Sequence, residues 1–241
     1  MKLDILVLAA HPDDAELSCS GTILSHIAQG YKVGIVDLTR GELGTRGSAE
    51  LRDQEAVASA KIMGLSVREN LAFEDGFFQN DRQHQLEVVK VIRKYRPEIV
   101  LCNAQSDRHP DHGKGGELAK TACFLAGLPK IETTLDGEKQ EAWRPKNLYQ
   151  YIQSNYIQPD FVVDCSDFWE KKVAAIRAFS SQFHTGAAGS DEGPQTFIST
   201  PGFIDFINAR GREFGQHIGV QYAEGFTTIK LIGVKNIFDL S

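Results

Sequence analysis

The feature that most constrains the fold is an almost continuous apolar run at residues 3–9 (LDILVLA). A strand that faces water on one side alternates apolar and polar residues, whereas a strand covered on both faces is apolar throughout. The run is also too short to form a membrane-spanning helix. It therefore predicts a central β-strand with helices packed above and below it.

Helices and strands are predicted to alternate along the first half of the chain. Beyond the first strand, the apolar pattern predicts helices at residues 16–29, 50–63, 85–95 and about 115–125, and strands at residues 32–38, 67–73 and 98–103. This rhythm is typical of parallel βαβ units. We expect a single α/β domain with a Rossmann-like, doubly wound, mostly parallel sheet and helices on both faces.

The pattern weakens in the second half. Residues 129–145 are polar and turn-rich, and we expect them to form a surface excursion. We predict strands at 148–152, 161–164 and 229–234, helices at 168–179 and 203–215, and a loop at 185–194. Within one domain spanning residues 1–241, residues 1–127 are expected to form the core that carries the functional site, and residues 128–241 to complete that site.

Composition excludes several classes of partner. Lys and Arg total 26 against 32 Asp and Glu, so the net charge is -6, and we expect neither nucleic acid nor a membrane as a partner. No signal peptide is recognisable at the start of the sequence, and the four cysteines form no CxxC pair. We therefore expect a cytoplasmic protein.

Two polar loops each follow a predicted buried strand. Residues 11–16 (HPDDAE) follow the first strand and residues 106–113 (SDRHPDHG) follow the fourth. Ligands of open α/β sheets bind at the carboxyl ends of the strands. If these two strands are neighbours, the loops face each other across one crevice. Taken singly, each loop has an ordinary structural explanation, because Asp before a helix is a common N-cap and His-Pro is a common turn.

Together, the two loops favour a metal site. Imidazole and carboxylate suit zinc, with bond lengths of about 2.0 to 2.2 Å, and a catalytic zinc usually keeps three protein ligands. The loops offer more groups than a metal needs, and the surplus suits a base, an acid and a carboxylate that orients an imidazole. Spacing alone does not assign these roles.

The two motifs, residues 11–16 and 109–112 (HPDH), resemble those of the LmbE or PIG-L family of zinc-dependent N-acetylglucosamine deacetylases. The resemblance implies that His11, Asp14 and His112 bind one Zn²⁺ per chain, although Fe²⁺ and other divalent metals suit the same ligands. Such a protein takes a small amino-sugar substrate. The resemblance also implies that the protein is a homo-oligomer, and a hexamer is one of the forms expected.

The resemblance also implies catalytic roles. Asp13 is expected to be the general base, and His109 the acid or the electrostatic stabiliser of the oxyanion. Asp111 is expected to hold His109 in its protonated orientation. Either Asp13 or His109 would protonate the departing amine.

Further segments resemble the branch that makes bacillithiol, in which acetate is removed from N-acetylglucosaminyl malate. These segments are residues 41–47 (GELGTRG), 181–184 (SQFH) and 215–226 (GQHIGVQYAEGF). A dianionic aglycone requires local positive charge, although an arginine is often only a solvated surface residue and a lone histidine is often structural. The candidate substrate-binding residues are Glu42, Arg46, Arg52, Arg108 and His184.

Two other functions stay open at this point. The same zinc centre could act on chitobiose, a mycothiol precursor or a lipid-linked sugar. Alternatively, the protein could be a non-catalytic sugar-binding protein with a structural metal, which would have four protein ligands and no turnover.

The assignment of Asp13 predicts a separation of metal binding from catalysis. The Asp13→Ala protein should retain zinc, because Asp13 is not an expected ligand, yet it should lose most of its turnover. Metal content and amide hydrolysis are measured on the same sample. A fully active Asp13→Ala protein would remove Asp13 from the mechanism.

Overall fold

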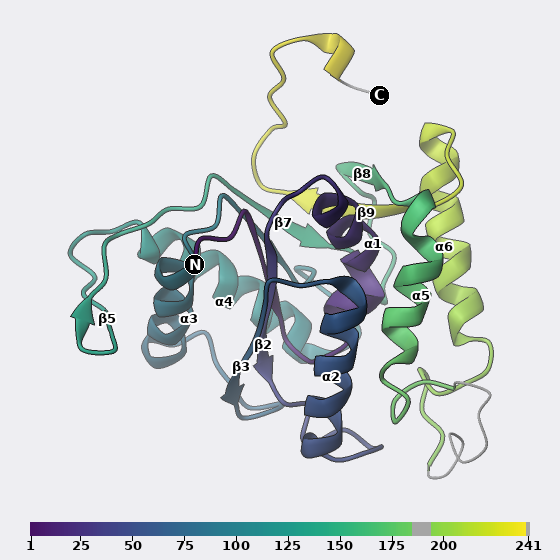
Figure 1. Ribbon diagram of the computed structural model, residues 1–241, viewed down its shortest axis with the longest axis horizontal. Coiled ribbons are helices and arrows are strands. Elements are labelled where there is room, and N and C mark those ends of the chain that lie inside the picture. Colours follow the sequence, from purple (N-terminus) through teal and green to yellow (C-terminus); the bar gives the residue numbers. More distant parts are fainter. Residues whose placement is uncertain (185–193, 240–241) are drawn as a thin grey trace.

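A central sheet crosses the protein in the computed structural model, which describes residues 1–184 and 194–239 (Figure 1). The sheet has seven strands in that part of the chain. The strand order is β3-β2-β1-β4-β7-β9-β8. All neighbouring strands are parallel except β9, which runs antiparallel to β7 and β8. The strands are β1 (Ile5–Ala9), β2 (Val33–Thr39), β3 (Val67–Phe73), β4 (Ile99–Cys102), β7 (Asn147–Tyr151), β8 (Phe161–Asp164) and β9 (Ala223–Thr228). The prediction of a mostly parallel α/β sheet is confirmed.

Helices cover both faces of this sheet, as Figure 1 shows. One face carries α1 (Asp14–Ala28), α2 (Ala49–Met63) and α5 (Trp169–Arg177), and the other carries α3 (Arg82–Tyr95) and α4 (Pro110–Ala126). The side chains of β1 enter both layers: Ile5, Val7 and Ala9 pack into the first, while Leu6 and Leu8 pack into the second. This is why the strand is apolar throughout. Helix α6 (Phe203–Ile218) packs against β9, and short 3₁₀ turns span η1 (Ser166–Phe168) and η2 (Ile237–Asp239).

Several predicted boundaries were wrong. Helix α4 begins at Pro110 rather than near residue 115, because proline suits the first turn of a helix, so most of the second motif is helical. The last strand is Ala223–Thr228, and residues 229–234 have no regular structure and are exposed. Residues 129–145 do form a surface excursion, which carries the small hairpin β5 (Thr134–Leu135) and β6 (Glu138–Lys139). The loop predicted at 185–194 lies, except for its last residue, outside the described residues.

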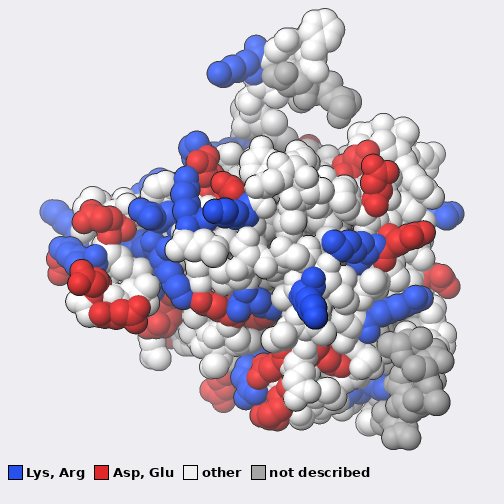
Figure 2. Space-filling model, viewed as in Figure 1, with Lys and Arg blue, Asp and Glu red and all other residues white. Residues whose placement is uncertain are grey.

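Two further observations concern the charge on the surface and the apolar composition of the helices. Basic and acidic side chains are interspersed over the face shown in Figure 2. Within residues 1–184 and 194–239, none of the helices combines the length and the apolar composition that crossing a bilayer requires.

A buried ion pair fastens α1 to α5 and β9. Lys172 Nζ lies 2.7 Å from Glu224 Oε1, and both side chains are almost fully buried. Lys172 also donates to the backbone carbonyls of Glu16 and Leu17, while the Glu224 carboxylate accepts from the N–H groups of Gly21 and Thr22. Because these backbone groups belong to α1, the pair fixes the helix that begins with Asp14.

Removing one partner of this pair should therefore destabilise the protein. Lys172→Met leaves the Glu224 charge buried and unpaired, and the free energy of unfolding should fall by about 3–5 kcal/mol. Urea denaturation measures the change, and Lys171→Met, at the exposed neighbouring position, is the matched control. Equal stability of the two variants would show that the ion pair contributes nothing.

Candidate metal centre and active site

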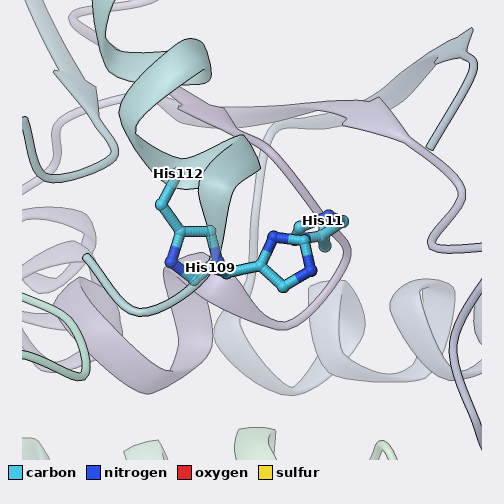
Figure 3. A group of neighbouring side chains, drawn as sticks. All are labelled: His11, His109 and His112. Carbon is cyan, nitrogen blue, oxygen red and sulfur yellow. The ribbon is translucent and has the colours of Figure 1, made fainter. Parts of the chain in front are cut away.

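The two motif loops meet because β1 and β4 are adjacent parallel strands. Leu8 pairs with Cys102, so both strands end at the same edge of the sheet. His11 comes from the loop after β1, while His109 and His112 come from the start of α4 (Figure 3). One nitrogen from each of these three rings lies within 4.8 Å of the others. The crevice expected from the sequence is formed.

The Asp14 carboxylate lies between two imidazoles. Its Oδ1 is 3.1 Å from His112 Nε2, and its Oδ2 is 3.6 Å from His11 Nδ1. Asn103 and Gln153 donate side-chain N–H groups to the same carboxylate, at 2.9 and 3.1 Å. Asp14 is therefore held in one orientation between the two histidines.

The second nitrogen of each imidazole contacts a different carboxylate. His112 Nδ1 lies 2.5 Å from Asp107 Oδ2. His11 Nε2 lies 3.1 Å from Asp75 Oδ1 and 3.4 Å from Asp111 Oδ2. Histidines that bind metals usually donate their other N–H to a carboxylate or carbonyl, which fixes the tautomer and the ring orientation.

These contacts test whether the site fits a metal ion. The Asp14 carboxylate lies 3.1 Å from His112 Nε2 and 3.6 Å from His11 Nδ1, separations that suit ligands about 2 Å from a common ion. Two other compact groups of possible ligands share His11: one adds His109 and His112, and the other adds Asp75 and Asp111. The geometry fits the ligand set His11, Asp14 and His112, and that assignment stays a prediction.

The electrostatic environments of Asp14 and His112 are consistent with this arrangement. Burial alone would raise the pKa of Asp14, but His112 and His11 hold it well below its usual range. Asp14 and Asp107 outweigh burial at His112 and raise its pKa to about 9. A metal ion that bound His112 Nε2 would therefore displace a proton.

Asp13, the expected base, has an unusual backbone and a charged partner. Its φ is 117°, in the left-handed region that favours glycine, which is a strained conformation for aspartate. Arg52 Nη2 lies 2.6 Å from Asp13 Oδ2 and donates at 2.9 Å to the carbonyl of Pro12. Burial raises the pKa of Asp13 to about 7, and Arg52 opposes that rise.

Arg52, an expected substrate-binding residue, lines the cavity, and its guanidinium is engaged by protein groups. Its Nη1 donates to the Gly41 carbonyl, and its Nη2 is engaged by Asp13 and Pro12. Only 6% of the residue is exposed. Arg52 acts on the site through Asp13, because the first turn of α2 brings its guanidinium against the loop after β1.

The Asp111 carboxylate was expected to hold His109, but its contacts are with other groups. His109 is the N-cap of α4, and its Nδ1 accepts a hydrogen bond from the backbone N–H of Asp111 at 3.3 Å. The Asp111 carboxylate instead accepts from Lys114 and from the Gly76 N–H, and it approaches His11. Burial, with His11 and His112, lowers the pKa of His109.

A cavity of about 300 Å³ opens onto the histidines. The lining includes the polar residues His11, Asp13, Asp14, Asp75, His109 and His112 and the apolar residues Phe197, Phe203, Phe206 and Ile207. Of the expected substrate-binding residues, Arg108 and Arg52 line the cavity. Among the described residues, its lining does not include Glu42, Arg46 or His184.

Glu42 and Arg46 instead contact protein groups. Glu42 accepts from the backbone N–H of Asp75, and Arg46 donates to the carbonyls of Ser181 and Pro194. These contacts connect the loop after β2 to its surroundings rather than to the cavity.

Sequence reasoning assigned no site role to several residues that shape this centre. Asp107 lies inside the second motif, two residues before His109, and could have been found there. Asn103 and Gln153 follow β4 and β7, so their position at the ends of parallel strands was the available signal. Arg210, on α6, also lines the cavity and carried no local signal.

Comparison with known proteins identifies relatives across most of the chain. The family model described as PIG-L, GlcNAc-PI de-N-acetylase, matches residues 6–123. Diacetylchitobiose deacetylase of Thermococcus kodakarensis is 33% identical over 74% of this chain and 70% of that protein. The 4-oxalmesaconate hydratase of Pseudomonas putida is 28% identical over 93% of this chain and 88% of that protein.

Two further relatives bear on the substrate and the fold. The probable N-acetyl-alpha-D-glucosaminyl L-malate deacetylase 2 of Bacillus anthracis is 25% identical over 75% of this chain and 82% of that protein. The solved structure of the conserved protein TT1542 from Thermus thermophilus is 35% identical, with a TM-score of 0.85, and covers 97% of this chain and 98% of that one. These similarities do not select one substrate branch.

The contact between Asp107 and His112 predicts an effect on metal affinity. Asp107→Asn removes the charge that orients His112, and affinity for Zn²⁺ should fall about tenfold or more. Competition with a chromophoric chelator measures it, and Asp164→Asn, at an exposed position on β8, is the control. An unchanged affinity would contradict the assignment of His112 as a ligand.

Proposed function

The chain belongs to the PIG-L family of de-N-acetylases, and on that premise we propose that it is a metal-dependent N-deacetylase of an N-acetylglucosamine conjugate. The observation that carries this proposal is the Asp14 carboxylate between His11 and His112, with Asp13 beside it. Both aspartates and both histidines line one cavity.

In this proposal, His11, Asp14 and His112 hold the ion, with Zn²⁺ as the expected metal and Fe²⁺ as an alternative. A divalent ion held there would supply Lewis-acid chemistry: it would polarise the amide carbonyl and lower the pKa of water to about 7. The carboxylates of Asp75 and Asp107 fix the two rings through the nitrogens that do not face Asp14.

Asp13 accepts the proton of the attacking water. A general base is most effective when its pKa lies near the working pH, and burial brings that of Asp13 to about 7. Arg52 orients this carboxylate and holds the adjoining Pro12 carbonyl, which maintains the strained backbone. Asp13 then holds a proton that the departing amine requires.

His109 lines the cavity beside both histidines, with its ring centroid 4.6 Å from that of His11 and 5.2 Å from that of His112. Because its Nδ1 accepts the Asp111 N–H bond, the proton of the neutral ring is on Nε2. That N–H is available to stabilise the negative charge that develops on the carbonyl oxygen. A neutral His109 cannot give up this proton to an amine, so in this proposal it stabilises the oxyanion, and Asp13 returns to the departing amine the proton that it took from water.

The finer proposal for the substrate is N-acetylglucosaminyl malate, the precursor in bacillithiol synthesis. The segments at residues 41–47, 181–184 and 215–226 support it, as does the relative from Bacillus anthracis. Arg108 is exposed and lines the cavity, where it can meet a carboxylate of the malate. Diacetylchitobiose is the alternative that the 33% identical relative supports. A homo-oligomer and a cytoplasmic location stay predictions.

A hydratase is the second candidate function. The relative named 4-oxalmesaconate hydratase matches 93% of this chain, and its reaction also adds water to its substrate. A base beside a metal centre can serve either reaction. Release of acetate distinguishes the deacetylase from the hydratase.

Acetate release tests the proposal directly. Zinc-loaded protein should release acetate from N-acetylglucosaminyl malate faster than from N-acetylglucosamine, because only the conjugate offers a carboxylate to Arg108. Better cleavage of diacetylchitobiose would keep the deacetylase and replace the malate substrate. Absence of acetate from all three, together with hydration of an unsaturated carboxylate, would favour the hydratase. Chelation of the metal should abolish release.

A further inference from the structure

The apolar side of the cavity is built by one face of α6 and by the segment before it. Phe203, Phe206, Ile207 and Arg210 follow the three- and four-residue spacing of one helix face, and all four line the cavity. Phe197 precedes the helix and contacts Phe206, with the ring centroids 6.1 Å apart. His11, Asp14, His109 and His112 line the same cavity.

Two guanidinium groups stand over these two rings. Arg108 Cζ lies 5.4 Å from the centroid of the Phe197 ring, and Arg210 Cζ lies 4.6 Å from that of Phe206. The arginines come from distant parts of the chain, one from the loop after β4 and the other from α6. Since the two rings touch, they place both cations along one wall of the same cavity.

Neither cation has a close acidic partner within residues 1–184 and 194–239. Both line the cavity, yet neither has a carboxylate oxygen within 4.0 Å in that part of the chain. Arg210 donates one hydrogen bond, from Nη2 to the Ser154 carbonyl at 2.6 Å. Arg52, in contrast, is paired with Asp13. The free donors of Arg108 and Arg210 are therefore available to a ligand.

The position of Arg210 makes an unpaired charge costly. It is half-buried, and burial lowers the pKa of its guanidinium, while the more distant charges of Asp107 and Glu213 oppose that change. A partly desolvated cation with unused donors is stabilised when an anion completes its hydrogen bonds. Arg212, two residues further along α6, is exposed and interacts with Tyr222 outside the cavity.

We propose that Arg210 and Arg108 form a two-arginine subsite for an anionic group on the substituent of the sugar, while Phe197 and Phe206 cover the apolar part of that substituent. This inference rests on the proposed function and extends it. Arg210 becomes a specificity-determining residue, and the class of substrate becomes an N-acetylglucosamine conjugate with a carboxylate or phosphate near its anomeric carbon.

Paired substrates test the subsite. Acetate release is measured with N-acetylglucosaminyl malate, N-acetylglucosamine 1-phosphate and neutral methyl N-acetylglucosaminide. For wild type, kcat/KM should be higher for an anionic conjugate than for the neutral glycoside. A preference for malate alone identifies a carboxylate, and a preference for the phosphate alone identifies a phosphoryl group.

Substitutions then assign the preference to Arg210. Arg210→Gln should raise KM for the preferred anion about tenfold or more, because a charged hydrogen bond is lost, while turnover of the neutral glycoside shows that the site is intact. Arg210→Lys should recover part of the loss. Arg212→Gln removes a charge from the same helix outside the cavity and should change neither substrate. The decisive quantity is the ratio of kcat/KM for the anionic conjugate to kcat/KM for the neutral glycoside. If this ratio is the same in wild type, Arg210→Gln and Arg212→Gln, the inference is overturned.

A binding measurement separates failure of the subsite from failure of the proposed function. Calorimetric titration of zinc-loaded protein with L-malate and with inorganic phosphate requires no turnover. If no substrate releases acetate but one anion binds wild type more tightly than Arg210→Gln, the deacetylase proposal fails and the subsite stands. If acetate is released and no anion effect depends on Arg210, the subsite fails and the deacetylase stands.

Discussion

The site depends on the buried Asp14 carboxylate between two imidazoles. A charge in this position is costly unless hydrogen bonds and opposite charges surround it. Its partners come from separate elements: Asn103 after β4, Gln153 after β7 and His112 on α4. These donors converge only when the three strands lie side by side in the observed order. The fold and the site are thus specified by the same contacts.

Two adjacent aspartates have opposite electrostatic environments. Asp14 faces His11 and His112, which hold its pKa well below the usual range, whereas burial raises that of Asp13 to about 7 despite Arg52. Environments that separate the pKa values of neighbouring carboxyls also separate their roles. Asp14 is suited to bind a metal, and Asp13 to accept a proton.

Much of the fold was predictable because burial leaves a clear pattern in the first half of the chain. Strand β1 is apolar throughout since its two faces enter different helix layers. Strand β9 was missed because Glu224, its second residue, is buried by pairing with Lys172 across 52 residues of sequence. The exposed apolar residues 229–234 resembled a strand more than the true one did. The local sequence pattern around Glu224 cannot reveal a partner as distant as Lys172.

The sequence by itself determined the chemical groups of the site and the strand ends that carry them, since motif composition and alternating apolar runs are local properties. Tertiary structure decided which group meets which. Arg52 contacts Asp13, the Asp111 carboxylate approaches His11, and Arg210 joins Arg108 in the cavity. The physical reason is that helix packing sets the direction of each side chain, and direction determines which nitrogen, carboxylate or guanidinium reaches a partner.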